Sequence, residues 1–137
     1  MSRENVEVVR DALNAWIEVD EGLAEPDRLA EFFVPDAIFA MGKRLGGAEL
    51  RGVDEFLAWR ATWIEPYEEW SYSAEKILDA GANRVVAMFH QRGKLRDSDS
   101  WLEWDYGIVY TVEEGLITRG EVYATPVEAL EAAGLSE

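Results

Sequence analysis

Hydrophobic residues follow a helical spacing in the first part of the chain and alternate with polar residues in the last part. Between residues 2 and 20, apolar side chains recur every three or four positions, which is the period of one buried helix face. Pro26 suits the first turn of a second, short helix, and Pro35 ends it. The inward-facing positions are predicted to be Val6, Val9, Leu13 and Trp16 in the first helix and Leu29, Phe32 and Phe33 in the second.

The rest of the chain predicts one strand, a loop, a third helix and an antiparallel meander. Residues 36–41 are typical of a strand, residues 42–52 of a glycine-rich loop, and residues 53–64 of a helix that ends before a proline. Four runs rich in β-branched and aromatic residues follow, and a Thr-Pro pair after them opens a last short helix. The strands of this meander are predicted at residues 67–78, 84–95, 100–112 and 116–124.

Charge patterning predicts the register of the middle hairpin. If residues 96–99 form its loop, Arg92 lies opposite Glu103 and His90 lies opposite Asp105, so opposite charges pair. The same register pairs Phe89 with Tyr106 and Ala87 with Ile108 on the other face. Both faces of the sheet are partly apolar. We therefore expect helices to cover one face and the partner subunit of a homodimer to cover the outer face, which carries Val86, Met88 and Val109.

Alternation in the last two strands predicts an aromatic wall that contains an acid. One face of residues 104–110 is aromatic or aliphatic, and alternate residues of 119–123 are expected on the same wall. A carboxyl group there would lose its water, which raises its pKa toward the range of a general base. The expected members of the wall are Trp104, Tyr106, Ile108, Tyr110, Arg119, Glu121 and Tyr123.

Composition restricts the class of protein. A chain of 137 residues that is 48% hydrophobic can build one core, so we expect a single domain over residues 1–137. A formal charge of −15 without a basic stripe argues against nucleic acid and anionic membranes as partners. The sequence lacks a membrane-spanning or signal-like apolar run, which leads us to expect a cytoplasmic protein. The chain has no cysteine, which excludes disulfides and thiol catalysis.

Five segments, in this order, resemble the SnoaL-like branch of the NTF2-like superfamily. The resemblance covers nearly the whole chain and implies an α+β fold in which a curved antiparallel sheet wraps around helices as a cone-shaped barrel. It also implies an internal pocket, dimerisation through the outer face of the sheet, and chemistry without a cofactor or a metal. The segments are residues 4–16, 29–37, 52–56, 79–86 and 115–130, which include Gly-Val-Asp-Glu-Phe and Gly-Leu-Ile-Thr-Arg-Gly-Glu-Val-Tyr.

The catalytic patterns of that superfamily are incomplete here. Polyketide cyclases of the SnoaL type resemble this chain in an acid at Glu121, but the histidine that they have on the preceding strand is replaced by Ile108. Limonene-type epoxide hydrolases use an Asp-Arg-Asp group, which Arg119 and Glu121 reproduce in part. The resemblance therefore suggests Glu121 as a base, with Arg119 and Tyr106 as electrophilic helpers. The alternative is that Arg119 and Glu121 form a structural ion pair.

We expect the pocket to bind a small apolar or aromatic molecule. Two functions stay open: a cofactor-independent cyclase, isomerase or hydratase of an apolar carbonyl compound, and a non-catalytic ligand-binding or dimerisation module. His90, expected opposite Asp105, is interpreted as a cross-strand hydrogen bond rather than as a catalytic base or a metal ligand. The predicted ligand-binding residues are Trp16, Phe39, Trp59, Trp63, Phe89, Gln91, Trp104, Ile108, Tyr110 and Tyr123.

Overall fold

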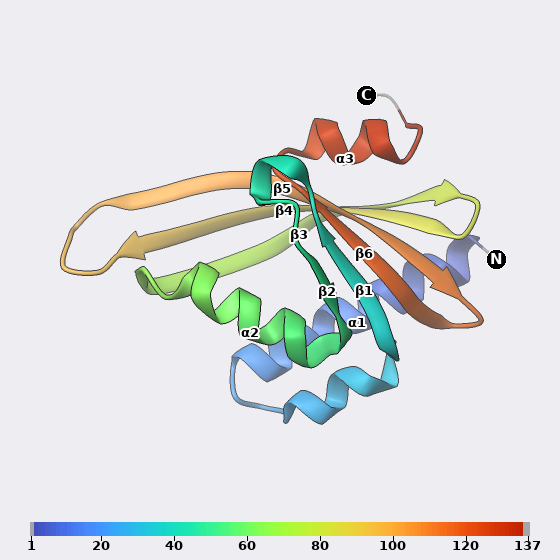
Figure 1. Ribbon diagram of the computed structural model, residues 1–137, viewed down its shortest axis with the longest axis horizontal. Coiled ribbons are helices and arrows are strands. Elements are labelled where there is room, and N and C mark those ends of the chain that lie inside the picture. The colour runs from blue at the N-terminus through green and yellow to red at the C-terminus, as the bar shows by residue number, and fades with distance from the viewer. Residues whose placement is uncertain (1, 136–137) are drawn as a thin grey trace.

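The computed structural model describes residues 2–135 and contains three α-helices and six strands in that part of the chain (Figure 1). Two short 3-10 helices, η1 and η2, lie on either side of the first strand. In chain order the elements are α1 (Ser2–Asp20), η1 (Pro26–Glu31), β1 (Phe33–Met41), η2 (Lys43–Leu45), β2 (Glu49–Arg51), α2 (Gly52–Ile64), β3 (Tyr67–Gly81), β4 (Arg84–Leu95), β5 (Trp101–Glu113), β6 (Leu116–Tyr123) and α3 (Pro126–Ala132).

The six strands form one curved, mixed sheet in the order β2-β1-β6-β5-β4-β3. Every neighbouring pair is antiparallel except β1 and β6, which run parallel. Helices α1 and α2 lie on one side of this sheet and α3 lies on the other (Figure 1). We call the side toward α1 and α2 the cone face, and the opposite side the outer face. The predicted α+β architecture is confirmed.

The first helix, the third helix and the meander lie where the hydrophobic pattern predicts them. Two predictions nearer the N-terminus are wrong. The short second helix is present as a 3-10 helix, but it ends at Glu31 rather than at Pro35, and Phe33 already belongs to the first strand. The predicted loop over residues 42–52 also contains β2, in which Leu50 pairs with Phe39 of β1. Three residues are too few to show an alternating pattern in the sequence.

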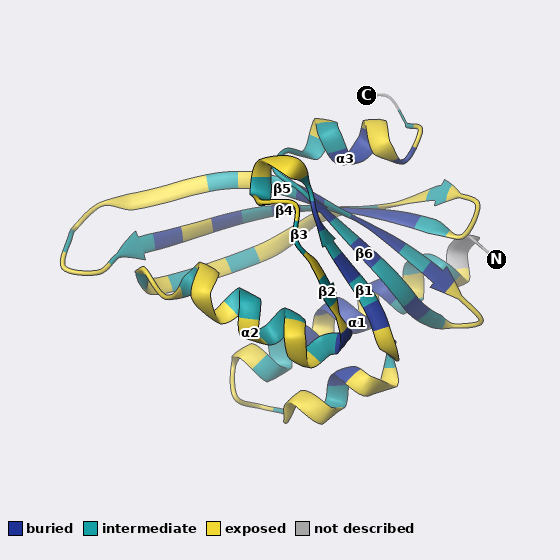
Figure 2. Ribbon diagram, in the orientation of Figure 1, coloured by how far each residue is buried: buried dark blue, intermediate teal, exposed yellow. Residues whose placement is uncertain are grey.

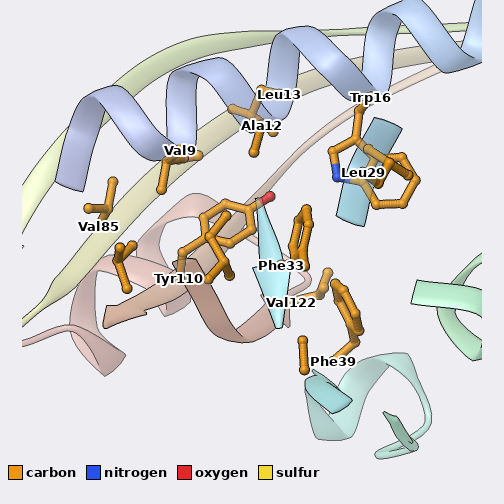
Figure 3. Close-up of a cluster of buried hydrophobic side chains, with 14 of the residues drawn as sticks. Val9, Ala12, Leu13, Trp16, Leu29, Phe33, Phe39, Val85, Tyr110 and Val122 are labelled. Carbon is orange, nitrogen blue, oxygen red and sulfur yellow. The ribbon is translucent and has the colours of Figure 1, made fainter. Parts of the chain in front are cut away.

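The main core fills the cone between α1 and the sheet. Val9, Leu13 and Trp16 of α1 point toward Phe33 and Tyr110 (Figure 3), and all five side chains are buried. The spacing of the three helix residues places them on one side of α1, which is why this helix covers the sheet. The predicted apolar face of α1 is thus the surface that covers the cone.

The middle hairpin has the register that its charges predict. Arg92 lies opposite Glu103 and His90 lies opposite Asp105 on the outer face. On the cone face, Phe89 and Tyr106 are opposite each other and their rings stack with centroids 4.9 Å apart. The pairing of opposite charges on one face and of aromatic rings on the other therefore indicates the same register.

The last hairpin contains a β-bulge that changes which residues of β6 face the cone. Near the turn, Val112 of β5 lies opposite Ile117 of β6. One step along the ladder, Thr111 lies opposite Arg119. Thr118 is therefore an extra residue on β6, and every later residue of this strand is shifted by one position relative to β5.

Because of this shift, the predicted acid does not face the cone. Without the bulge Ile108 would lie opposite Glu121, whereas it lies opposite Val122. Glu121 is opposite Val109, whose side chain is on the outer face. Arg119 and Tyr123 are on that face as well. The prediction that these three residues share a wall with Tyr106 and Tyr110 is wrong.

The outer face is covered in its middle by α3. Val86 and Val109 are fully buried within one chain, where they pack with Ala129 and Leu130 of α3. Figure 2 shows buried positions in the middle of β4, β5 and β6, and an exposed tip on the hairpin of β4 and β5. The expectation that a partner subunit is needed to cover these valines is wrong, because α3 covers them. The homodimer itself stays a prediction.

None of the helices in residues 2–135 combines the length and the apolar character that a membrane span requires.

Candidate functional site

A cavity of about 350 Å³ lies between the cone face of the sheet and α2. A smaller chamber of about 60 Å³ adjoins it beneath α1 and shares part of its wall. The larger volume falls in the range of ~300–1,000 Å³ that is usual for small-molecule sites. The residues that line both spaces are Phe56, Arg60, Trp70, Tyr106, Ile108 and Val122.

Aromatic rings from α2 form one wall of the cavity. The rings of Phe56, Trp59 and Trp63 are stacked in a row, with centroids 6.2 Å and 5.4 Å apart and planes within 16° of each other. Phe39 of β1 extends the row, 4.4 Å from Phe56. Residues three or four positions apart share a helix face, so the row follows from the sequence of α2. Such a row offers a flat apolar surface to a ligand.

One charged side chain lines the cavity among the described residues. Arg60 of α2 donates two hydrogen bonds to Asp20, from Nη1 to Oδ1 at 3.0 Å and from Nη2 to Oδ2 at 2.7 Å. The Tyr72 hydroxyl of β3 donates to the same Oδ2 at 2.7 Å. The guanidinium also lies over the rings of Trp16 and Trp70, at 5.1 Å and 4.7 Å from their centroids. We call Asp20, Arg60 and Tyr72 the cone triad.

The residues of the cone triad are not among the predicted site residues, although the sequence carries a signal for them. Arg60 comes four residues after Phe56, so it lies on the aromatic face of its helix. Asp20 comes four residues after Trp16 and therefore ends the apolar face of α1. A charge on each of two apolar helix faces is a sign that the two charges pair where the helices pack.

Burial keeps the phenols of the cone protonated. It is the main cause that raises the pKa of Tyr106 and of Tyr110 above the ordinary value of a tyrosine. The pKa of Tyr72 is raised by burial and, next, by the charge of Asp20. These hydroxyls therefore act as hydrogen-bond donors rather than as phenolate bases.

Two further donors near the cavity are buried without a partner among residues 2–135. They are Nε1 of Trp70 and Nε2 of Gln91, and both side chains line the larger cavity. Its described lining contains no carboxylate and no histidine. The arrangement thus favours a ligand that accepts hydrogen bonds.

Ten of the predicted site residues line one or both spaces. The larger cavity is lined by Trp59, Trp63, Gln91, Trp104, Tyr106 and Ile108. The smaller chamber is lined by Trp16, Phe39, Phe89 and Tyr110. Residues that sequence reasoning missed are, besides Arg60 and Tyr72, Leu13, Leu45, Phe56, Tyr67, Trp70, Val122 and Ala124.

Arg119, Glu121 and Tyr123 lie on the outer face, away from both spaces. Arg119 Nε donates to Glu121 Oε2 at 3.1 Å, and its Nη2 is 3.9 Å from Oε2 of Glu49. The structure thus contains the ion pair that the sequence offered as the alternative to catalysis. Glu121 has no place on the wall of the cavity, since the bulge turns it outward.

His90 is held between two carboxylates on the outer face. Its Nδ1 is 2.7 Å from Asp105 Oδ1 and its Nε2 is 2.9 Å from Glu103 Oε1. These hydrogen bonds, first that of Asp105 and then that of Glu103, raise the pKa of the imidazole. The predicted cross-strand hydrogen bond to Asp105 is therefore present. In the described part of the chain, no group of three or more ligands is arranged to hold a metal ion.

Residues 9–120 match the SnoaL-like domain family, and the chain therefore belongs to that family. No curated protein matches it in sequence. An NTF2-like protein of unknown function from Burkholderia pseudomallei has a similar structure, with 16% identity, 93% of this chain and 95% of that chain covered, and a TM-score of 0.70.

Two further solved structures share the fold. TerC, co-crystallised with polyporic acid, is 16% identical over 96% of this chain and 98% of its own, with a TM-score of 0.71. A putative SnoaL-like polyketide cyclase from Jannaschia is 16% identical over 88% of this chain and 85% of its own, with a TM-score of 0.66. Identities this low show a common fold and leave the activity open.

Proposed function

We propose that this protein binds a small, flat, largely apolar molecule that carries a hydrogen-bond acceptor, in the cavity beneath α2. The observation that carries the proposal is the cavity of about 350 Å³, whose wall is mostly aromatic and whose polar groups include several donors. Aromatic walls with a few fixed polar groups are typical of small-molecule sites. The co-crystal of TerC with polyporic acid supports the same use of this fold.

Cofactor-independent catalysis on an apolar carbonyl compound, as a cyclase, isomerase or hydratase, is the second candidate. The observation that favours it is the cone triad. Arg60 and the Tyr106 hydroxyl would polarise a carbonyl oxygen and stabilise an enolate. Asp20 lines neither space, so it would accept a proton through Tyr72, whose hydroxyl is 2.7 Å away and whose side chain lines the smaller chamber: the hydroxyl would pass its own proton to Asp20 as it takes one from the ligand. In this scheme Glu121 has no role, since it lies on the outer face.

The binding proposal can be tested by filling the cavity. Ala124 lines the larger cavity, whereas Ala58 is an exposed residue of α2 outside its lining. We expect Ala124→Trp to abolish binding of tetralin and α-tetralone in calorimetric titrations, because the indole occupies the space of the ligand. The matched variant Ala58→Trp should bind as the wild type does. Equal titration curves for wild type and Ala124→Trp would contradict the proposal.

The catalytic candidate needs a separate test with a reacting carbon acid. Exchange of the α-protons of α-tetralone for deuterium can be followed by proton NMR in deuterated buffer. Asp20→Asn should slow protein-dependent exchange by the ~10²–10⁴-fold that proton transfer contributes. Glu121→Gln should leave it unchanged. An exchange rate that does not exceed that of buffer would contradict the catalytic candidate and leave binding as the only proposed function.

A further inference from the structure

Gln91 carries an amide into the buried core, with 2% of its surface exposed. Its Nε2 has no hydrogen-bond partner in the described part of the chain, and neither does Nε1 of Trp70. Burial of an unpaired donor costs free energy, because the hydrogen bonds to water are lost and none replaces them. Two such donors beside one cavity indicate that something else accepts their hydrogen bonds.

The register of β3 and β4 brings the two donors together. Gln91 lies opposite Tyr72, and Trp70 lies opposite Gly93. Trp70 and Gln91 are therefore diagonal neighbours on the cone face, a separation of about 7–8 Å between backbone positions that long side chains span. Gly93 leaves room beside the two side chains for the ring of Tyr67, since a Cβ at residue 93 would lie 2.6 Å from Cδ1 of that ring. The two side chains are thus neighbours in the wall of the cavity.

The charge in the cavity is already neutralised. The bidentate pair with Asp20 balances the guanidinium of Arg60, and their side chains are only 24% and 13% exposed. An anionic ligand would lose its hydration in this space without meeting an unbalanced cation. The net charge of −15 adds long-range repulsion. An uncharged acceptor such as a carbonyl oxygen meets neither penalty.

We infer that Trp70 and Gln91 form a two-donor subsite that holds a carbonyl-type oxygen of an uncharged ligand, and that Asp20 makes the cavity select this ligand over a carboxylate. The inference rests on the proposed binding function and adds to it the charge state and the polar anchor of the ligand.

Three probes of similar shape test the subsite: tetralin, α-tetralone and tetralin carboxylate. In the wild type we expect α-tetralone to bind more tightly than tetralin by roughly 3–10-fold, the worth of one or two neutral hydrogen bonds. The carboxylate should bind most weakly. On addition of α-tetralone, the indole N–H resonance of Trp70, assigned with Trp70→Phe, should shift downfield. Addition of tetralin should leave it near its original position.

Gln91→Met keeps the length of the side chain and removes the donor. It should bring the affinity for α-tetralone close to that for tetralin. Without ligand it should raise the midpoint of thermal unfolding, by roughly 3–5 °C, since an unpaired amide leaves the core. Trp70→Phe removes the other donor and should likewise weaken the preference for the ketone. Trp63→Phe is its matched control, because Trp63 lines the same cavity but is 39% exposed. It should leave the preference for the ketone intact.

Asp20→Asn tests the charge argument. Asparagine keeps the shape and one acceptor oxygen for Arg60, but the cavity gains a net positive charge. The affinity for tetralin carboxylate relative to α-tetralone should rise by about 10-fold. An unchanged ratio would show that Asp20 does not set the selectivity and would overturn that half of the inference.

The outcomes separate the inference from the function on which it rests. If tetralin binds the wild type as tightly as α-tetralone does, the two-donor subsite is wrong, while the binding function stands. A lower unfolding midpoint for Gln91→Met would likewise mean that its amide is satisfied within the protein. If none of the three probes binds the wild type, the binding function itself fails, and the subsite fails with it.

Discussion

The two faces of the same sheet handle polar groups in opposite ways. On the outer face, charged side chains pair with one another and remain in contact with water, as in the ion pair of Arg119 with Glu121 on β6. On the cone face, one ion pair is held among aromatic rings and two neutral donors are left unpaired. Paired groups on an exposed face maintain the fold, whereas unpaired donors beside a cavity imply a ligand. The proposed ligand site on the cone face is therefore identified by its unsatisfied hydrogen-bond donors rather than by residue type.

The largest expected effect comes from breaking the ion pair of the cone face. Asp20→Ala leaves the guanidinium of Arg60 without its partner among aromatic rings. We expect a loss of about 2–4 kcal/mol in the free energy of unfolding, below the full cost of a completely buried pair because Asp20 keeps some exposure. Denaturant unfolding measures it.

An exposed pair provides the control for this loss. Glu7→Ala removes the partner of Arg10 on the surface of α1, where both side chains are about half exposed, and should cost under about 0.5 kcal/mol. The double variant Asp20→Ala with Arg60→Met should recover part of the stability. A loss for Asp20→Ala no greater than that for Glu7→Ala would remove the distinction between the faces.

Two glycines allow the packing of the faces to be compared directly. A Cβ at Gly107 would lie 2.6 Å from Cβ of Ala129 in α3, and a Cβ at Gly93 would lie 2.6 Å from Cδ1 of Tyr67. The helix can make room only by moving its backbone, while the ring of Tyr67 can turn. Gly107→Ala should therefore cost about 1–3 kcal/mol, and Gly93→Ala less. Equal losses in thermal unfolding would contradict this difference.

The ion pair of the outer face should matter much less than that of the cone. Arg119 and Glu121 are 37% and 26% exposed in their side chains. Glu121→Gln should therefore lower the free energy of unfolding by only about 0.2–1 kcal/mol. Binding of α-tetralone should be unchanged, because the residue lies behind the wall of the cavity. Loss of binding in calorimetric titrations would restore Glu121 to the site.

Most of the fold could be predicted from the sequence because its signals are periodic and local. The stripe of α1, the long strands and the charges of the middle hairpin all repeat over many residues. The position of Glu121 could not be predicted, because one extra residue, Thr118, inverts the faces of the strand after it. Nothing in the local alternation distinguishes a bulged strand from a regular one.

Only about half of the residues of the candidate site could be predicted, for a related reason. Aromatic residues were recognised as a wall from their spacing alone. The contact of Asp20 with Arg60 joins residues 40 positions apart, and Tyr72 is 52 positions from Asp20. Such a contact depends on how α1, α2 and β3 pack, which no pattern within one element contains. Only the placement of a charge on each apolar helix face pointed to it.

The smallest expected effect concerns His90, and it tests whether the polar groups of the outer face act on stability through pH. The carboxylates of Asp105 and Glu103 raise the pKa of the imidazole in the folded state. The charged form is therefore favoured by folding. Its contribution is fully present below the pKa of the unfolded state, about 6.5, and is lost as the pH rises through the higher folded value.

Thermal unfolding of wild type and His90→Gln between pH 5 and 9 measures this contribution, with pH points set around ~6.5. The wild type should be the more stable at the acidic end, and the difference should shrink as the imidazole loses its proton. Arg92→Gln is the matched control, because the charge of Arg92 on the same strand face does not change in this range. If the stability difference between wild type and His90→Gln grows with pH instead, the neutral imidazole stabilises the hairpin. The difference between the polar groups of the outer face and those of the cone face would then need another cause.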